Sequence, residues 1–127
     1  MHYLNKLDDV AIDDVPRSVV HSDLINRNVL VQAGSVAGVF DWGCSLYGDH
    51  LFDLAWFEFW SPWHPNLDLA PLRASLSDAL GSNVERRLMA SLLYIGLAHI
   101  VYNAHQEDWS GVESVERRLA EVCADLS

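Results

Sequence analysis

The sequence predicts a mostly helical α+β domain, with a β-hairpin near its beginning and four helices after it. Two short apolar runs, at residues 29–31 and 36–40, flank a turn at residues 33–35 that contains glycine. Such a pattern is typical of a hairpin, here expected over residues 28–32 and 36–41. Apolar residues at helical spacing, separated by helix-start and helix-stop signals, predict the helices that follow.

The residues on either side of the hairpin carry weaker signals. Residues 1–9 can form one or two helical turns, which the aspartates and proline of residues 13–16 end. Residues 18–20 are expected to form a short strand that leads toward the hairpin. Residues 42–48, directly after the hairpin, are expected to be a loop.

The first two helices are predicted from a capping residue and from leucine spacing. Asp49 can cap a helix that runs to about Trp60, and apolar residues go nearly all round this helix, so we expect it to be buried. Residues 61–65 contain two prolines and end it. Gly81 ends the second helix. The leucines that mark this second helix are Leu69, Leu72, Leu76 and Leu80.

The last two helices each begin at a predicted capping box, in which a serine and a glutamate three residues later bond each other's backbone amides. Ser82 and Glu85 open a long, central and buried helix that runs to about His105. Ser110 and Glu113 open an amphipathic helix that lies on the core. Its apolar stripe consists of Val112, Val115, Leu119, Val122 and Leu126.

The composition indicates a single domain that spans residues 1–127, with half of its residues hydrophobic and five tryptophans. The formal net charge of −10 argues against nucleic-acid binding, because phosphate contacts need clustered lysine and arginine. An acidic surface would suit a polycationic substrate such as an aminosugar. Solubility alone explains the same charge and is the simpler explanation.

Two cysteines, Cys44 and Cys123, lie far apart in the sequence without metal-ligand spacing, which indicates free thiols in a reducing compartment. The chain opens with polar and acidic residues rather than with a signal peptide. Its longest apolar run, residues 88–102, is too short to span a bilayer and contains Gly96 and His99. We therefore expect a cytoplasmic protein without membrane contact.

Three oxygen-bearing side chains, those of Asp23, Asn28 and Asp41, are expected to converge at one end of the hairpin. Asn28 opens the first strand and Asp41 closes the second, and these ends of an antiparallel pair lie side by side. Mg²⁺ binds such oxygens, through one or two carboxylates plus substrate phosphates. Four residues separate Asp23 from Asn28, and twelve separate Asn28 from Asp41. This spacing matches the pattern of ATP-dependent phosphoryl transfer.

Residues 18–60 resemble the catalytic segment of the aminoglycoside phosphotransferase family, and within it the pattern is most similar to hygromycin-B phosphotransferases. The motifs that carry the resemblance are His21-Ser22-Asp23, Asn28-Val29-Leu30, Val39-Phe40-Asp41-Trp42, Gly48-Asp49, Asp53-Leu54-Ala55 and the aromatic run 56–63. The resemblance implies the large, carboxyl-terminal lobe of a protein-kinase-like fold. It also implies that Asp23 is the catalytic base and that Asn28 and Asp41 hold Mg²⁺ beside ATP.

The chain departs from the family's pattern. Residues 25–27 stand where the family usually has His-Pro-Gly, and Cys44 stands where many members carry an acidic residue; both bear on the substrate more than on the reaction. The resemblance also implies an amino-terminal nucleotide-binding lobe with a glycine-rich loop and a lysine–glutamate pair. The residues before His21 contain no such loop, and Lys6 is the only lysine. We therefore expect the catalytic lobe alone, with little kinase activity by itself.

Five further residues are expected to support the site. His21 would hold the catalytic loop by hydrogen bonds. Asp53 is a charge on a buried helix and needs a partner, for which Arg27 or a backbone amide of the loop would serve. The alternative is a partly exposed carboxylate that the helix dipole favours. Asp49 would brace the loop together with Asp53, and Glu58, near the cleft, could bind a substrate amine.

We therefore expect a phosphotransferase that moves the γ-phosphate of ATP to a hydroxyl group of a small molecule, with a cationic aminosugar as one candidate substrate. An alternative is a non-catalytic remnant that keeps the fold and forms a homodimer through exposed side chains around Val20, Leu30 and Phe40. A third and weaker alternative is a Mg²⁺-dependent phosphohydrolase that uses the same carboxylates.

Overall fold

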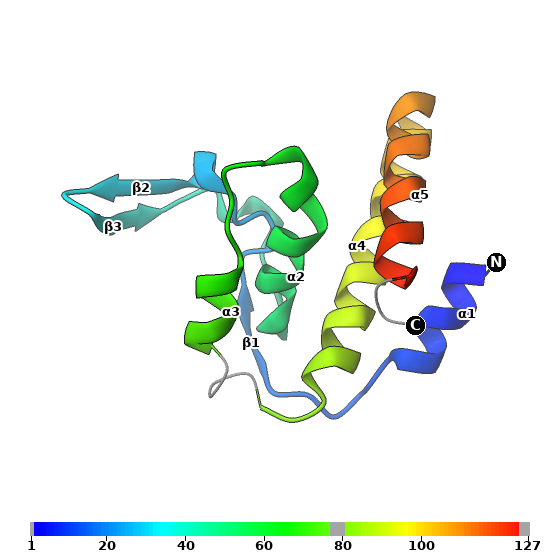
Figure 1. Ribbon diagram of the computed structural model, residues 1–127, viewed down its shortest axis with the longest axis horizontal. Helices are drawn as coiled ribbons and strands as arrows, with labels where there is room; N and C mark the ends of the chain where they lie inside the picture. Colours follow the sequence, from blue (N-terminus) through cyan, green and yellow to red (C-terminus); the bar gives the residue numbers. More distant parts are fainter. Residues whose placement is uncertain (1, 77–80, 125–127) are drawn as a thin grey trace.

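The chain folds into a helical body from which a two-stranded hairpin projects (Figure 1). The computed structural model describes residues 2–76 and 81–124. The α-helices are α1 (His2–Val10), α2 (Leu51–Trp60), α3 (Ala70–Leu76), α4 (Val84–His105) and α5 (Trp109–Ala124). The strands are β1 (Arg17–Val20), β2 (Val29–Gln32), β3 (Ser35–Val39) and β4 (Leu46–Asp49), and short 3₁₀ turns are η1 (Asn26–Asn28), η2 (Trp42–Cys44) and η3 (Ser61–Trp63). The predicted α+β class, with a hairpin and four α-helices after it, is confirmed.

The hairpin consists of β2 and β3, which pair antiparallel. Its two turn residues, Ala33 and Gly34, have φ angles of 51° and 77°. Positive φ at both central residues is the turn whose twist matches paired strands. The predicted hairpin is confirmed, but its strands are shorter than expected, since Asn28 lies in η1 and Asp41 lies beyond β3.

A second pair of strands was not predicted. β4 pairs antiparallel with β1, with Arg17 opposite Asp49 and Val20 opposite Leu46. The prediction of a loop over residues 42–48 is therefore wrong, because this segment contains η2 and most of β4. Glycine and aspartate are poor strand formers, and the partner strand is far away in the sequence, so local patterns do not reveal the pairing.

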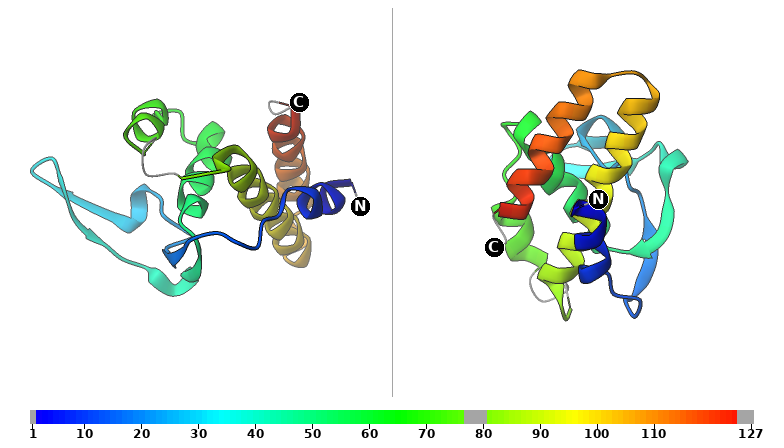
Figure 2. Two further views of the ribbon diagram at one scale, coloured as in Figure 1. Left: turned by 90° about the horizontal axis from the view of Figure 1, so that it is seen from below. Right: turned by 90° about the vertical axis from the view of Figure 1, so that its right-hand side faces the viewer.

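The core lies between α2, α4 and α5, with α4 in the middle (Figures 1 and 2). α4 contacts α2, α5 and α1. The side chains of Phe59 in α2, Leu93 in α4 and Leu119 in α5 are fully buried. The predicted burial of the helices that became α2 and α4 is confirmed. Each large apolar side chain contributes about 1.5–3 kcal/mol when buried, so this body supplies most of the stability.

α5 packs on α4 through the predicted apolar stripe, although Leu126 lies outside the described residues. The two helices approach closely at Gly96, where an added Cβ would overlap the side chain of Leu119. Only glycine allows this approach without a shift of one helix. The described members of the stripe are Val112, which is half-buried, and Val115, Leu119 and Val122, which are buried.

The predicted capping box at α4 is wrong. Asn83, not Ser82, precedes the helix, with a φ of 55° and no side-chain capping bond. The Ser82 carbonyl instead accepts a hydrogen bond from Arg87 at 3.1 Å. The long arginine side chain thus folds back over the start of its own helix.

The predicted capping box at α5 is also wrong by position. The helix begins at Trp109, one residue before Ser110. The carboxylate of Asp108 accepts hydrogen bonds from the Gly111 N–H and the Ser110 hydroxyl, each at 3.0 Å. An aspartate directly before the helix thus caps it through the Gly111 amide, whereas the serine was expected to cap it through the Glu113 amide.

α3 covers the described part of the second predicted helix, and the end that Gly81 was expected to mark follows residues 77–80, which lie outside the described residues. Asp68 accepts the Ala70 N–H at 3.0 Å and so caps its first turn.

α4 is long and apolar enough, by length and composition alone, to cross a membrane, and it extends beyond residues 88–102, the apolar run that was expected to be too short. Its neighbours give a simpler explanation, because α4 packs against three other helices and buries eight of its residues. The core helix of a soluble protein passes the same test of length and composition.

The three apolar side chains that were expected to be exposed to solvent differ in their exposure. Val20 is buried at 1% exposure, which corrects the expectation, whereas Leu30 and Phe40 are 54% and 48% exposed. Leu30 lies on β2 and Phe40 directly follows β3, and these two strands project from the body (Figure 2). Cys44 is exposed and Cys123 is buried, and neither of the two is in a disulfide, as predicted.

Candidate active site

The loop at residues 21–28, called the catalytic loop after its predicted role, connects β1 to the hairpin, and His21 holds it by hydrogen bonds. The imidazole Nε2 lies 2.8 Å from the Phe40 carbonyl, and the Asp23 N–H points at Nδ1 from 3.3 Å. These partners fit a neutral ring that donates through Nε2 and accepts through Nδ1. The indole of Trp42 packs on the ring, with centroids 4.7 Å apart. His21 thus ties the loop to the end of β3.

Asp53, in the first turn of α2, anchors the start of the same loop. Its carboxylate accepts the His21 N–H at 3.0 Å and the Ser22 N–H at 2.8 Å. Of the two partners expected for this charge, the structure shows the backbone amides and not Arg27. Charge-assisted bonds of this kind are about twice as strong as neutral ones.

Ser22 is a contributor that sequence reasoning missed. Its φ of 58° lies in the left-handed region, which costs free energy for a residue other than glycine. Its hydroxyl donates to the Cys44 carbonyl, which links the catalytic loop to η2 on the other side of the site. A serine between His21 and Asp23 was visible in the sequence, but its backbone conformation was not.

Asp23 and Asn28 lie against each other across the loop. The Asn28 side chain is 4% exposed, and its Nδ2 donates to the backbone carbonyl of Asp23 at 2.7 Å and to its carboxylate at 3.2 Å. The amide therefore turns its Oδ1 away from Asp23, where it remains an acceptor for a cation. Arg27 Nη2 lies 3.6 Å from the Asp23 carboxylate, and its side chain is 69% exposed.

Asp41 follows β3 at the same end of the hairpin. The Phe40 N–H donates to the Asn28 carbonyl at 3.1 Å, so Asp41 is the next residue after this pairing. Its φ of 60° is left-handed, a conformation that aspartate tolerates better than most residues, and it directs the chain into η2. Its side chain is exposed. That the Asn28 and Asp41 oxygens reach one cation remains a prediction.

The donor set fits Mg²⁺ better than zinc or calcium. No group of three or more His, Cys, Asp or Glu side chains that could hold a metal ion occurs among residues 2–76 and 81–124. Mg²⁺ needs only one or two protein carboxylates and takes its other ligands from phosphates and water. One carboxylate and one amide oxygen beside the partly accessible Asp23 carboxylate therefore suit a metal that arrives with a nucleotide.

Asp49 does not brace the catalytic loop as expected. Its carboxylate binds Arg87 of α4 through two bonds of 2.6 and 2.7 Å and accepts the Leu51 N–H at 3.0 Å. Burial raises the pKa of the Asp49 carboxyl, but the bonds from Arg87 and Leu51 outweigh burial and leave the pKa below its ordinary value. Asp49 thus fastens β4 and the start of α2 to the core helix.

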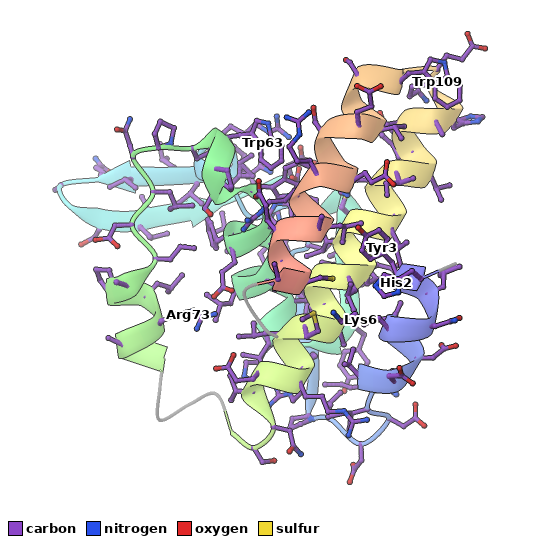
Figure 3. All side chains as sticks on the ribbon, turned by 45° about the vertical axis from the view of Figure 1, so that its right-hand side comes forward. His2, Tyr3, Lys6, Trp63, Arg73 and Trp109 are labelled. Carbon is purple, nitrogen blue, oxygen red and sulfur yellow. The ribbon has the colours of Figure 1, made fainter. Side chains whose placement is uncertain are left out.

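Glu58 is not free to bind a substrate amine, which corrects the weak expectation for it. Arg73 of α3 grips both of its carboxylate oxygens, at 2.6 and 2.8 Å. Figure 3 shows the Arg73 side chain directed from α3 toward the helical body. Arg118 donates to the backbone carbonyl of the same residue at 2.9 Å. Glu58 therefore joins α2 to α3 and has no spare charge for a ligand.

A cavity of about 460 Å³ lies beside the catalytic loop. Leu24 and Ile25, directly after Asp23, form one wall, and the hairpin residues Val29 and Val31 extend it. The opposite wall comes from the end of α2, η3 and the segment after them, with the residues Trp56, Phe57, Trp60, Trp63, His64, Pro65, Asn66 and Leu67. The aromatic run was expected to be core, and Phe59 is buried there, with Trp56 and Trp60 packed against it. Trp56, Phe57 and Trp60 also line this cavity.

A family model described as "Phosphotransferase enzyme family" matches residues 2–90. The curated hygromycin-B 4-O-kinase of Escherichia coli is 36% identical over 61 residues, which cover 45% of this chain and 18% of that protein. The chain therefore matches only a minor part of this relative's length.

Solved structures of the aminoglycoside phosphotransferase APH(4)-Ia share the fold. The apo form of a thermostable mutant has a TM-score of 0.79 at 26% identity, over 98% of this chain and 43% of that chain. A ternary complex of such a mutant with AMP-PNP and hygromycin B has a TM-score of 0.78 at 27% identity, over 94% of this chain and 41% of that chain. The similarity confirms the kinase-like fold.

Proposed function

Because the chain belongs to the phosphotransferase enzyme family, we propose that its catalytic loop transfers the γ-phosphate of ATP to a hydroxyl group of a small molecule. The observation that carries the proposal is the contact of the buried Asn28 amide with the carboxylate of Asp23. The two residues that phosphoryl transfer requires on one loop thus lie together, in the order and spacing that the reaction uses.

Asp23 is the base in this proposal. Its carboxylate is partly accessible and would accept the proton of the attacking hydroxyl while orienting it toward the phosphorus. The His21 ring and the Asp53 carboxylate act through the loop backbone, because Asp53 accepts the N–H groups of the two residues before Asp23 and the His21 ring accepts the Asp23 N–H. They are positioning residues, and they keep the carboxylate at one place in the transition state.

Asn28 and Asp41 would hold Mg²⁺ through oxygen atoms, the Oδ1 of the amide and the exposed carboxylate. The ion would neutralise negative charge on the transferred group when it is bound. The solved relatives in complex with AMP-PNP or ADP support ATP as the donor, and the donor set supports the metal. A hydroxyl acceptor follows from the catalytic aspartate and from the kinases that the chain resembles.

A phosphotransfer assay with γ-labelled ATP, Mg²⁺ and a panel of hydroxyl compounds that includes hygromycin B tests the proposal. In a full-length parent that also carries the amino-terminal lobe, we expect Asp23→Ala to lower the rate by at least about 100-fold, since the base acts in the transition state. Asp68→Ala, which removes an exposed carboxylate at the start of α3, is the matched control and should keep the wild-type rate. Equal rates for wild type and Asp23→Ala would contradict the proposal.

A further inference from the structure

Arg118 of α5 binds the end of a helix that lies far from it in the sequence. Its Nη2 donates to the Glu58 carbonyl at 2.9 Å, and its Nε donates to the Phe59 carbonyl at 3.0 Å. Both acceptors belong to the last turn of α2, where the helix dipole favours a cation. The Arg118 side chain is 16% exposed. Arg118 therefore fastens the end of α2 to α5.

The sequence at the end of α2 explains why a distant donor is used. In a continuing α-helix, the Glu58 carbonyl would accept the N–H of residue 62, four positions later. Residue 62 is a proline, which has no N–H. The Ser61 hydroxyl reaches the same carbonyl at 3.0 Å, but it belongs to the segment that follows the helix. The Arg118 bonds instead tie this carbonyl to another helix of the body.

The backbone directly after these carbonyls carries two tryptophans of the cavity wall. Trp60 ends α2, Trp63 ends η3, and their ring centroids lie 5.3 Å apart. Both residues line the cavity opposite Leu24 and Ile25, which directly follow Asp23. The position of the end of α2 therefore sets how far this wall lies from the catalytic loop.

The indole of Trp60 is held by ring packing. Its Nε1 atom is buried and has no acceptor among residues 2–76 and 81–124. The ring packs against Trp63 and His99, with centroids 5.3 and 4.7 Å apart. Apolar packing is less directional than a hydrogen bond. The place of this ring therefore depends on the backbone that carries it, and the Arg118 bonds fix that backbone.

We propose that Arg118 is a positioning residue for the acceptor, and that its two bonds to the end of α2 set the distance between the wall at Trp60 and Trp63 and the catalytic loop. The inference rests on the proposed function for the use of the cavity by the acceptor. Arg118 acts through the backbone of residues 58–63 and not by contact with the acceptor. A displacement of about 1 Å far from the chemistry can cost about 100-fold in rate.

Calorimetry on the full chain without nucleotide tests the inference, with hygromycin B as the probe. Arg118→Met keeps an apolar stem but removes every N–H donor of the side chain. We expect it to weaken hygromycin B binding by about fivefold or more. A variant that only folded less completely would instead show a lower stoichiometry at an unchanged affinity. Equal affinities in wild type and Arg118→Met, or no binding to wild type, would overturn the inference.

Two further variants assign the effect to the Arg118 bonds. Arg118→Lys keeps a cationic donor that can reach one carbonyl, so it should regain part of the affinity that Arg118→Met loses. Arg117→Met, on the exposed face of α5, is the matched control and should bind hygromycin B like wild type. An affinity of Arg118→Lys no higher than that of Arg118→Met, or an equal loss in Arg117→Met, would overturn the assignment.

NMR without any ligand shows whether the wall moves separately from the catalytic loop. The indole N–H signals of Trp60 and Trp63 should shift or broaden in Arg118→Met. The backbone signal of Asp23 should stay in place, because the bonds from His21 and Asp53 that hold the loop do not involve Arg118. Unmoved indole signals, or an equal change at Asp23, would overturn the inference. Absence of phosphotransfer, with a hygromycin B affinity that still depends on Arg118, would contradict the proposed function and leave this inference standing.

Discussion

The catalytic loop is fixed by hydrogen bonds to a few carboxylate and carbonyl oxygens, whereas the body of α2, α4 and α5 is fixed by apolar packing. The loop side contains left-handed backbone at Ser22 and Asp41 and exposed apolar residues on the hairpin. The body contains the fully buried Phe59, Leu93 and Leu119.

The difference indicates a division between stability and function. The helical body can hold the start of the catalytic loop because Asp53 lies on α2, and α2 is packed in the core. Residues on the loop side can then adopt strained backbone conformations in the candidate active site, because packing in the body offsets the free energy that the strain costs. Substitutions in the two regions should therefore separate into effects on unfolding and effects on binding.

The largest effect on stability is expected in the core. Phe59→Ala should lower the free energy of unfolding by about 3–5 kcal/mol, because it leaves a cavity where a fully buried ring was. Phe40→Ala, at 48% exposure on the loop side, is the matched control and should cost less than about 1 kcal/mol. Urea denaturation followed by circular dichroism measures both. Similar losses of the free energy of unfolding in the two variants would contradict the proposed division between stability and function.

The next effect joins the two regions through a buried ion pair. Arg87→Met should cost roughly 3 kcal/mol, because the Asp49 carboxylate loses a bidentate partner that is 4% exposed. Glu121→Ala, which breaks an exposed pair with Arg118, should cost less than about 1 kcal/mol by the same denaturation assay. If Arg87→Met lowered the free energy of unfolding no more than Glu121→Ala does, the Arg87 bonds to Asp49 would not be important for stability.

The same pair predicts a pH dependence. The pKa of Asp49 is lower in the folded chain than in the unfolded chain, so its stabilisation is complete above about pH 4 and is lost as the pH falls through the lower folded value. Wild type should therefore lose more stability than Arg87→Met between about pH 5 and pH 2, the region in which a paired aspartate is protonated. If wild type and Arg87→Met lost the same free energy of unfolding over this pH range, the pairing of Asp49 would not contribute to the loss of stability in acid.

A smaller loss is expected where the body anchors the loop. Asp53→Asn should cost about 1–2 kcal/mol, because the charged acceptor of two amides becomes a neutral one. It should also broaden or shift the backbone NMR signals of Asp23 and leave those of Leu93 in place. Unchanged signals in the loop would show that Asp53 does not position it.

The smallest effect on folding is expected at the hairpin. Leu30→Ser with Phe40→Ser should change the free energy of unfolding by less than about 1 kcal/mol, since both side chains are about half exposed. If the hairpin forms the contact between copies that the remnant alternative requires, the double variant should sediment as a monomer at a concentration at which wild type is a dimer. A wild-type monomer under the same conditions would remove the proposed contact.

The sequence predicted features that depend on local chemistry. The hairpin turn, the buried helix α2 and the stripe of α5 each follow from residue type and spacing, and the structure has all three. The motif around Asp23 likewise predicted that His21 holds the loop by hydrogen bonds, and it predicted one of the two partners offered for Asp53, a backbone amide of the loop.

Features that depend on distant partners were missed. β4 exists because β1 pairs with it, and Asp49 turns to Arg87, which is 38 residues away. Glu58 was assigned to a ligand because Arg73 comes from a later helix whose position the sequence does not specify. The errors have the same cause. In each case an arginine or a strand from a distant part of the sequence forms hydrogen bonds with the residues in question.

Mn²⁺ binding in the presence of AMP-PNP tests the central claim, that Asn28 and Asp41 hold the metal of a phosphotransferase site. Water-proton relaxation of the full chain should show one bound Mn²⁺, with an affinity lowered by about tenfold or more in Asn28→Ala and in Asp41→Asn, since each loses a ligand oxygen or its charge. Asp68→Ala should bind like wild type. No bound Mn²⁺ in wild type, or equal affinities in all four proteins, would contradict the account.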